Sequence, residues 1–417
     1  MGTFVRGSSL ISAIALALFA CGCSCEASRT STATVDAGPL FGGIDASGYE
    51  PRDSGPRPPE PCAVPIRRVH FALGDESLGL NNGLWVSGSR AWVYLGGYAG
   101  AFPVSSPPSL HLFDLEAERE LATDFVVAEE DVLLGVFDAP SGFEVIVRSS
   151  TGRPRIVHVD HDGRRTGGAE ERLELASAPL VRLDDGRYLG MTLFESGTTP
   201  VPASLEIATP AGWVQRIELG FETMSGHLTA LYWNGDVVVG LGYEDATQSV
   251  LRFEVNLDTA AVRLGTLVEG VRLAGVVGAR LALSASASTA TAALTYESAD
   301  MPEGSPETAE LFWWPIGGEP VTRQIMRPAS DLYVGILALG GTMPLQTLVL
   351  SQSASARTWV TAARIRAPGE VVGGAEPLGV FGGISNAAAW NPSEGTVAIA
   401  LVAQHELEAL YVCEGAP

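Results

Sequence analysis

The chain has 417 residues, of which 46% are hydrophobic, and this length allows one large core or two or three ordinary domains. Its 26 basic residues, all arginine, face 48 acidic ones, so the formal net charge is -22. This balance argues against a nucleic-acid partner, because phosphate contacts need a basic surface, and against electrostatic docking on an anionic membrane.

The first twenty residues are predicted to be a signal peptide. Arg6 supplies a positive charge, and residues 10–20 form an apolar run of eleven residues. That run is too short for a helix that crosses a bilayer, which needs about 20 apolar residues. Its length is typical of a secretory signal.

The apolar run ends in Leu18-Phe19-Ala20-Cys21. This ending resembles the bacterial lipoprotein signal, in which a cysteine after a small residue becomes lipidated. The resemblance implies a lipid on Cys21; Cys23 is a second candidate, and a plain signal peptide cut near Ala20 is the alternative. Because Gly22 and not Asp follows, the resemblance also implies sorting to the outer membrane. We therefore expect a lipoprotein of the cell envelope, facing the periplasm or the exterior.

Residues 21–61 are predicted to be a disordered tether. Ser, Thr, Gly, Asp and Pro dominate this segment, and it has no apolar periodicity. Such a composition cannot bury enough surface to offset the entropy lost on ordering. The segment is interpreted as a spacer that holds the domain away from the membrane.

Two kinds of hairpin recur along residues 62–417. In the first, apolar strands flank a polar turn that usually contains glycine, as in residues 84–94. Further copies are expected at 136–145, 181–188, 231–238, 276–281, around Gly340-Gly341 and at 389–397. The second hairpin starts with a short alternating strand that ends at Asp114, Asp160, Ala208, Asn256, Pro315, Arg366 and Cys413. By subtraction, these ends are 46, 48, 48, 59, 51 and 47 residues apart, and residues 297–306 are interpreted as a loop insertion in the longest step.

Two hairpins per repeat give four strands per repeat. Repeats of roughly 40 to 50 residues with four strands resemble the blades of β-propellers. The resemblance implies an all-β fold over residues 62–417, a single propeller with seven four-stranded blades, although counts of six and eight stay open. It is a resemblance to propellers in general and identifies no single propeller family.

The ends of the repeat region are predicted to meet. The seventh repeat ends on a third strand at Cys413, and residues 63–71 form an orphan strand before the first repeat. We expect this N-terminal strand to complete the last blade, which would bring Cys62 beside Cys413. Export into an oxidising compartment favours a disulfide between them; two unpaired buried thiols are the alternative. For Cys23 and Cys25 the sequence does not decide between pairing, free thiols and modification.

No sequence motif identifies a catalytic centre. The segment His158-Val159-Asp160-His161-Asp162-Gly163 offers two imidazoles and two carboxylates as metal ligands, but Asp160 to Gly163 lies where a hairpin turn is expected, and we favour the turn. The paired acids Asp184-Asp185 are also interpreted as a solvated turn, and Trp313-Trp314 as a stacking platform or an interface between blades. We predict no catalytic residue, no metal site and no cofactor.

Two functions remain open at this point. The first is a non-catalytic binding or scaffolding module, monomeric and anchored by its lipid, whose partner is an envelope protein or a glycan. The alternative is a propeller-type enzyme, a glycan hydrolase or lyase, with catalytic residues from several blades. A hydrolase would need two acids, and because the expected inner strands are nearly free of acids, the sequence favours binding over catalysis.

Overall fold

The computed structural model describes residues 67–413, all within the compact unit Gly38–Pro417. Its gaps are 74–82, 97–107, 129–130, 150–152, 168–170, 176–179, 192–199, 224–229, 273–279, 303–307, 327–332, 341–344, 355–356, 367–369, 382–383, 394–395 and 404–405. For residues 324–387 the description is of the backbone. The regular structure of the described residues is strand alone, and they include no helix that is long and apolar enough to cross a membrane.

The first four sheets are antiparallel, and in each the strands pair in chain order. The first contains β2 (Gly83–Ser87), β3 (Arg90–Leu95), β4 (Ser109–Asp114) and β5 (Arg119–Leu121). The second contains β6 (Asp131–Ala139), β7 (Gly142–Ser149), β8 (Arg155–Val159) and β9 (Glu171–Arg172). The third contains β10 (Leu180–Arg182), β11 (Tyr188–Met191), β12 (Val201–Thr209) and β13 (Gly212–Thr223). The fourth contains β14 (Ala230–Trp233), β15 (Val237–Glu244), β16 (Ser249–Asn256) and β17 (Ala261–Val268).

Three further sheets follow in the described residues. The fifth has five strands: β18 (Val271–Arg272), β19 (Arg280–Ala285), β20 (Thr289–Ser298), β21 (Thr308–Pro315) and β22 (Thr322–Met326), with β18 and β19 both paired to β20. The sixth has β23 (Tyr333–Gly340), β24 (Leu345–Ala354), β25 (Arg357–Arg366) and β26 (Glu370–Phe381). The seventh has β27 (Ile384–Ser393), β28 (Thr396–Ala403), β29 (Glu406–Cys413) and β1 (Arg67–Ala72).

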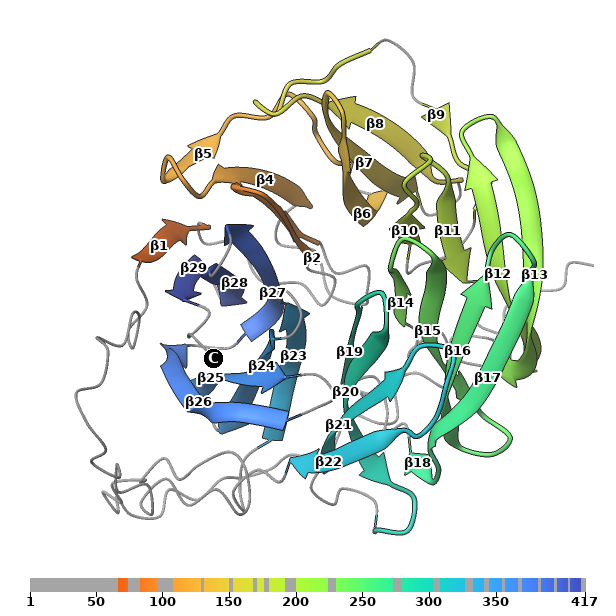
Figure 1. The fold of residues 1–417 in the computed structure, drawn as a ribbon. Coiled ribbons are helices and arrows are strands. Elements are labelled where there is room, and N and C mark those ends of the chain that lie inside the picture. Colours follow the sequence, from red (N-terminus) through yellow and green to blue (C-terminus); the bar gives the residue numbers. More distant parts are fainter. Residues whose placement is uncertain are drawn as a thin grey trace, which may run out of the picture. The chain divides into compact units, whose positions relative to one another are not determined.

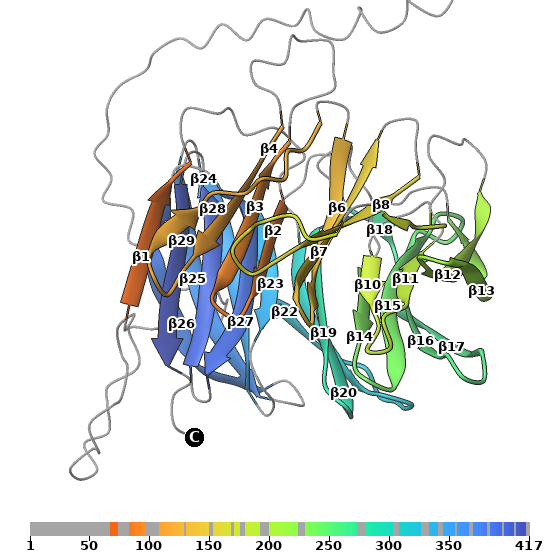
Figure 2. The same ribbon diagram turned by 90° about the horizontal axis from the view of Figure 1, so that it is seen from above.

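The seventh sheet joins the two ends of the described chain. Strand β1 pairs antiparallel with β29, with Arg67 opposite Tyr411 and His70 opposite Glu408. Figure 1 shows the orange β1 beside the dark blue β29, and Figure 2 shows the same strands side by side from above. The expected pairing of the N-terminal strand with the strand that ends at Cys413 is thus present.

The predicted ends of the third strands agree with the structure. Strands β4, β16, β21, β25 and β29 end at the predicted residues, and β8 and β12 end within one residue of them. The fifth inner hairpin was predicted wrongly. It lies between β19 and β20, with its turn at Ser286–Ser288, and not at 276–281.

Apolar side chains fill the spaces between successive sheets. One cluster joins Leu205 and Ile207 of β12 to Phe253 and Val255 of β16, and another joins β15 to β20 and β21. A third joins the seventh sheet to the first, through Ala409 of β29 and Val93 of β3. The faces that these clusters cover therefore find their core against a neighbouring sheet, which a single sheet cannot provide.

The first strands of successive sheets lie next to one another. Contacts run from β2 to β6, β10, β14, β19, β23 and β27 in turn, and β27 contacts β2. The turns that follow these strands are therefore brought close together, although they are far apart in the sequence.

Close packing across one strand pair depends on a glycine. Gly240 of β15 lies directly opposite Phe253 of β16, and a Cβ at position 240 would collide with the Phe253 ring. The ring fills the space that the missing side chain leaves and joins the cluster between the third and fourth sheets. Protein interiors are packed too densely to absorb an added methyl group here without a shift.

We expect Gly240→Ala to lower the free energy of unfolding by about 1–3 kcal/mol, the usual cost of overpacking. Urea denaturation of the folded domain measures this loss. In a Phe253→Leu background the added methyl meets no ring, so its cost should shrink, and a double-mutant cycle gives the coupling. An equal cost in both backgrounds would show that the ring is not the obstacle.

Candidate functional site

The positions predicted for lipid and disulfide lie outside the described residues. This holds for Cys21, for Cys62 and for the side chain of Cys413, whose backbone ends β29. The signal peptide and the tether, residues 1–61, also lie outside. Lipidation at Cys21 and the Cys62–Cys413 disulfide therefore stay predictions.

The two histidines that were weighed as metal ligands take separate partners. His158 Nε2 lies 3.8 Å from Glu171 Oε1, whereas the His161 ring packs edge-on against an aromatic ring of β7. Asp160 Oδ1 accepts a hydrogen bond from the backbone N–H of Asp162 (2.9 Å). These contacts fit the predicted turn, in which the Asp160 side chain accepts hydrogen bonds from backbone N–H groups.

The aromatic pair on β21 is buried. Trp314 is fully enclosed and its Nε1 donates a hydrogen bond to Glu254 Oε1 (3.1 Å), and Trp313 is also buried. The guanidinium of Arg252 lies 5.7 Å from the centre of the Trp314 ring. The interpretation of this pair as a stacking platform is therefore wrong, and both rings belong to the packing of the sheets.

Polar contacts bridge neighbouring sheets at the ends of their first strands and in the turns that follow; we call this region the first-turn rim. Ser87 Oγ donates a hydrogen bond to Asp138 Oδ1 and so joins the first sheet to the second. Asn234 Nδ2 donates to the carbonyl oxygen of Ser286 (3.0 Å) and joins the fourth sheet to the fifth. The rim thus adds directional contacts to the apolar packing and fixes the side chains that make them.

The third and fourth sheets meet at an acid and an aromatic ring of the first-turn rim. Trp233 Nε1 at the end of β14 donates a hydrogen bond to Asp184 Oδ2 (3.1 Å). The indole is half-buried against the cluster between these sheets, while Asp184 is exposed. An exposed carboxylate held beside an aromatic ring offers both a proton-transfer group and a flat apolar surface.

The next residue along this turn has a different role. Asp185 accepts hydrogen bonds from the backbone N–H (3.0 Å) and from Nε (2.7 Å) of Arg187. Burial opposes ionisation of Asp185, but these bonds outweigh it and hold the pKa of its carboxyl below the usual value. Of the two acids that sequence analysis assigned to a turn, Asp185 accepts its hydrogen bonds from within the turn, whereas Asp184 accepts one from the neighbouring sheet.

A partly buried triad joins the second and third sheets behind the rim. Glu144 of β7 accepts hydrogen bonds from Arg182 of β10 and from the hydroxyl of Tyr188 of β11 (2.6 Å). Tyr188 is 1% exposed, and burial, reinforced by the Glu144 carboxylate, raises the pKa of its hydroxyl. Tyr188 therefore remains a neutral donor, out of reach of a substrate, and the triad is a structural link.

This raised pKa predicts a loss of stability in alkali. Unfolded tyrosine ionises near pH 10, whereas folded Tyr188 keeps its proton, so the free energy of unfolding falls as the pH rises above about 10. Burial also raises the pKa of Tyr94, Tyr243, Tyr296 and Tyr411. We expect Tyr188→Phe to flatten the decline of the melting temperature above about pH 10; an unchanged decline would contradict the assignment.

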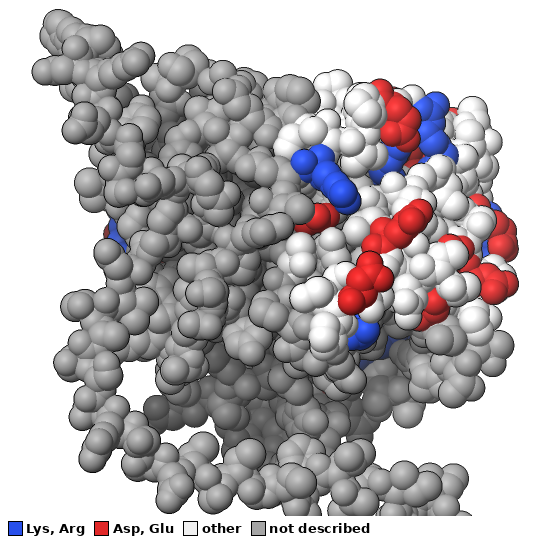
Figure 3. Space-filling view, turned by 90° about the horizontal axis from the view of Figure 1, so that it is seen from below, with Lys and Arg blue, Asp and Glu red and all other residues white. Residues whose placement is uncertain are grey.

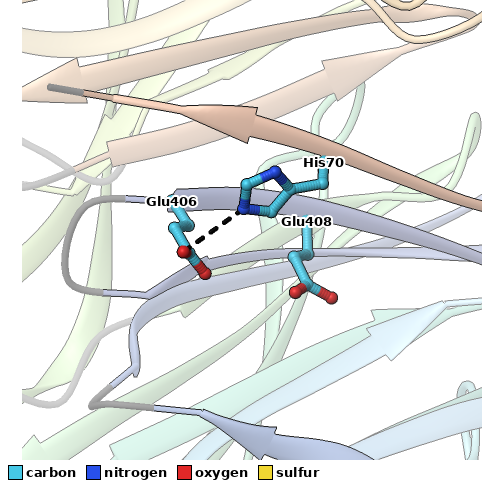
Figure 4. Close-up of side chains that lie close together, drawn as sticks. All are labelled: His70, Glu406 and Glu408. Carbon is cyan, nitrogen blue, oxygen red and sulfur yellow. Dashed lines mark ion pairs between the residues drawn. The ribbon is translucent and has the colours of Figure 1, made fainter.

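One cluster of metal-ligating groups lies at the junction of β1 and β29. His70, Glu406 and Glu408 lie close together there, and one ligand atom of each lies within 4.8 Å of the others (Figure 4). Sequence analysis missed this group because its members are separated by most of the chain. The signal that could find it is the register of the β1–β29 pair, which places His70 opposite Glu408.

Comparison with known proteins finds a likeness of fold alone. No protein-family model matches the sequence, and no curated protein matches it. The structural neighbours are β-propeller proteins. A Kuenenia stuttgartiensis hydrazine synthase is similar with a TM-score of 0.52 and 10% identity, over 79% of this chain and 96% of that one. An ulvan lyase, a polysaccharide lyase, has a TM-score of 0.49 and 9% identity, over 83% of this chain and 95% of that one. The β-propeller domain of a Pyrococcus furiosus protease has a TM-score of 0.39 and 11% identity, over 66% and 80%.

The comparison corrects the predicted function. The neighbours include polysaccharide lyases and an arabinanase, so the prediction of a non-catalytic binding module is contradicted and is not carried further. The physical reason for the error lies in where acids were sought. The expected inner strands were read as nearly free of acids, whereas the structure places two exposed acids at the ends of such strands, Asp138 within β6 and Asp184 just after β10. At this identity the likeness bears on the fold alone, so the chemistry must be argued from the residues of this chain.

Proposed function

We propose that the protein is an exported, lipid-anchored enzyme that hydrolyses a glycan of the cell envelope or its surroundings. The observation that carries this proposal is a pair of exposed carboxylates on neighbouring sheets, Asp138 near the end of β6 and Asp184 in the turn after β10. Each is held by a donor from the adjacent sheet, Asp138 by Ser87 and Asp184 by Trp233. Oriented acids on a rigid frame are what general acid–base catalysis requires.

A seven-bladed propeller provides the frame for this site. The support comes from the unbroken series of contacts between first strands, which leads from β2 through the other sheets and back to β2. Strand β1 completes the seventh blade, and a disulfide between Cys62 and Cys413 joins its ends. In a closed propeller the first-turn rim encircles one mouth of the central channel, where a polymer can reach several blades at once.

Two carboxylates suffice for glycoside cleavage. One protonates the leaving oxygen, and the other activates water or attacks the sugar. Asp138 and Asp184 are assigned this pair of roles, and Trp233 supplies an aromatic face against which a sugar ring can stack. Asp185 is excluded from the pair because the backbone and side chain of Arg187 hold its carboxylate.

The charge of the protein favours hydrolysis over elimination. Elimination requires a uronate next to the glycosidic bond, and therefore an anionic polymer. A chain of net charge -22 repels such a polymer. On the face in Figure 3, basic and acidic side chains are interspersed over the described surface, with no large basic area to attract a polyanion. We therefore assign a neutral glycan as the substrate.

The assignment predicts a selective loss of activity. The soluble domain, residues 62–417, is incubated with neutral glycans, and the release of reducing ends is measured. We expect Asp138→Asn and Asp184→Asn each to lower kcat by about 10²-fold or more, because each removes a proton-transfer group. The matched control is Asp185→Asn, which changes the adjacent acid and should leave the rate nearly unchanged.

Other outcomes would contradict the assignment. Equal losses in all three variants would indicate damage to the turn. Products with an ultraviolet-absorbing double bond would show that the enzyme cleaves by elimination and not by hydrolysis. Full activity in Asp138→Asn and Asp184→Asn would remove both residues from the reaction.

The envelope anchor is tested separately. If Cys21 carries the lipid, the full-length chain should incorporate radiolabelled palmitate, and Cys21→Ser should abolish the label. Cys23→Ser is the matched control and should keep it. Label that persists in Cys21→Ser but disappears in Cys23→Ser would move the site by two residues, and release of the wild-type chain as a free protein would exclude the anchor.

A further inference from the structure

The junction of β1 and β29 presents three ligand groups on one face. Successive side chains of a strand alternate between faces, so Glu406 and Glu408, two residues apart, share a face of β29. His70 of β1 is the cross-strand partner of Glu408 and lies on that same face. In Figure 4 the imidazole stands over Glu406, with Nε2 3.3 Å from Oε1, and Glu408 lies beside them.

Glu408 is the unusual member of this group. Glu408 is 9% exposed. Its Oε2 atom is buried and accepts no hydrogen bond from the described residues. Arg68 Nε forms an ion pair with this oxygen at 3.5 Å, and the Arg68 side chain is half-exposed. A buried carboxylate oxygen normally receives a hydrogen bond or a metal ion. The buried oxygen of Glu408 is therefore served by one long ion pair and no hydrogen bond among the described residues, and a closer cation would stabilise it further.

We propose that His70, Glu406 and Glu408 bind a zinc ion that fastens the N-terminal strand to the last sheet. The ligand set favours zinc because imidazole nitrogen and carboxylate oxygen are both its ordinary ligands. Calcium and magnesium prefer ligand sets made of oxygen alone. With His70 Nε2 and one oxygen from each glutamate, the site has three protein ligands, and water takes the fourth position of a tetrahedron.

The position of the site gives the ion a structural consequence. One ligand comes from β1 and two from β29, so a bound zinc ion links strands at opposite ends of the described chain. Ions that bind the folded state but not the unfolded one raise stability in proportion to the logarithm of their concentration. Zinc should therefore resist separation of β1 from the edge of β29.

The test measures zinc binding to the full-length chain purified in detergent. Isothermal titration with Zn²⁺ should give one site that excess Mg²⁺ does not fill. We expect His70→Ala and Glu408→Gln each to weaken zinc binding by about tenfold or more, since loss of even an outer partner of a metal ligand costs about that much. Zinc should also raise the melting temperature of the wild type and not of His70→Ala.

Two controls separate this site from other zinc ligands. His111→Ala removes an imidazole from a similar ion pair, in which His111 Nδ1 lies 2.8 Å from Glu120 Oε1, and should leave zinc affinity unchanged. Replacement of Cys23 and Cys25 by serine removes thiolates that can bind zinc, and should also leave it unchanged. Wild-type affinity in His70→Ala, loss of binding in either control, or no binding by the wild type would overturn the proposal.

Discussion

Apolar packing between successive sheets is the interaction on which the remaining structure depends. A sheet of four short strands has two faces and cannot bury either one alone. Here Leu205 and Phe253, from different sheets, lie in one cluster, and Val93 and Ala409 bring the first sheet against the last. Strand β1 comes from the start of the described chain, yet it belongs to the last sheet, where it pairs with β29. Without it, β29 would present an open edge.

The packing also explains where polar groups can be placed. Between the sheets a polar side chain must find a partner, as Glu144 does with Arg182 and Tyr188. At the rim, water can hydrogen-bond to the polar groups that the protein leaves unpaired, so the exposed carboxylates of Asp138 and Asp184 do not have to be desolvated. Their single donors from the neighbouring sheet orient them without enclosing them. A reactive acid can therefore be accommodated at the rim with little loss of stability.

The sequence predicted the repeat well because its signals are local. Strand ends such as Asp114 and Asn256 are marked by turn residues whose side chains accept hydrogen bonds from the following backbone, as both do here. The fifth inner hairpin was misplaced for a local reason too. Its turn has no glycine, and Ser286 Oγ instead accepts hydrogen bonds from the N–H groups of Ser288 and Thr289. In sequence, a serine turn of this kind cannot be told from other short polar segments, whereas the glycine at position 278 suggested a turn there.

The candidate sites could not be predicted in the same way, because their geometry is set by register between distant segments. Closure by the N-terminal strand was expected, yet the strand alone does not say whether His70 faces Glu408. A slip of one residue would turn His70 to the opposite face and place Val69 among the glutamates. The buried set on β1, Val69 and Phe71, excludes that slip, since it would expose two apolar side chains. The core thus selects the register, and the register selects which polar groups meet. Two chains that are about 10% identical can therefore share the arrangement of their sheets while different polar side chains come together on them.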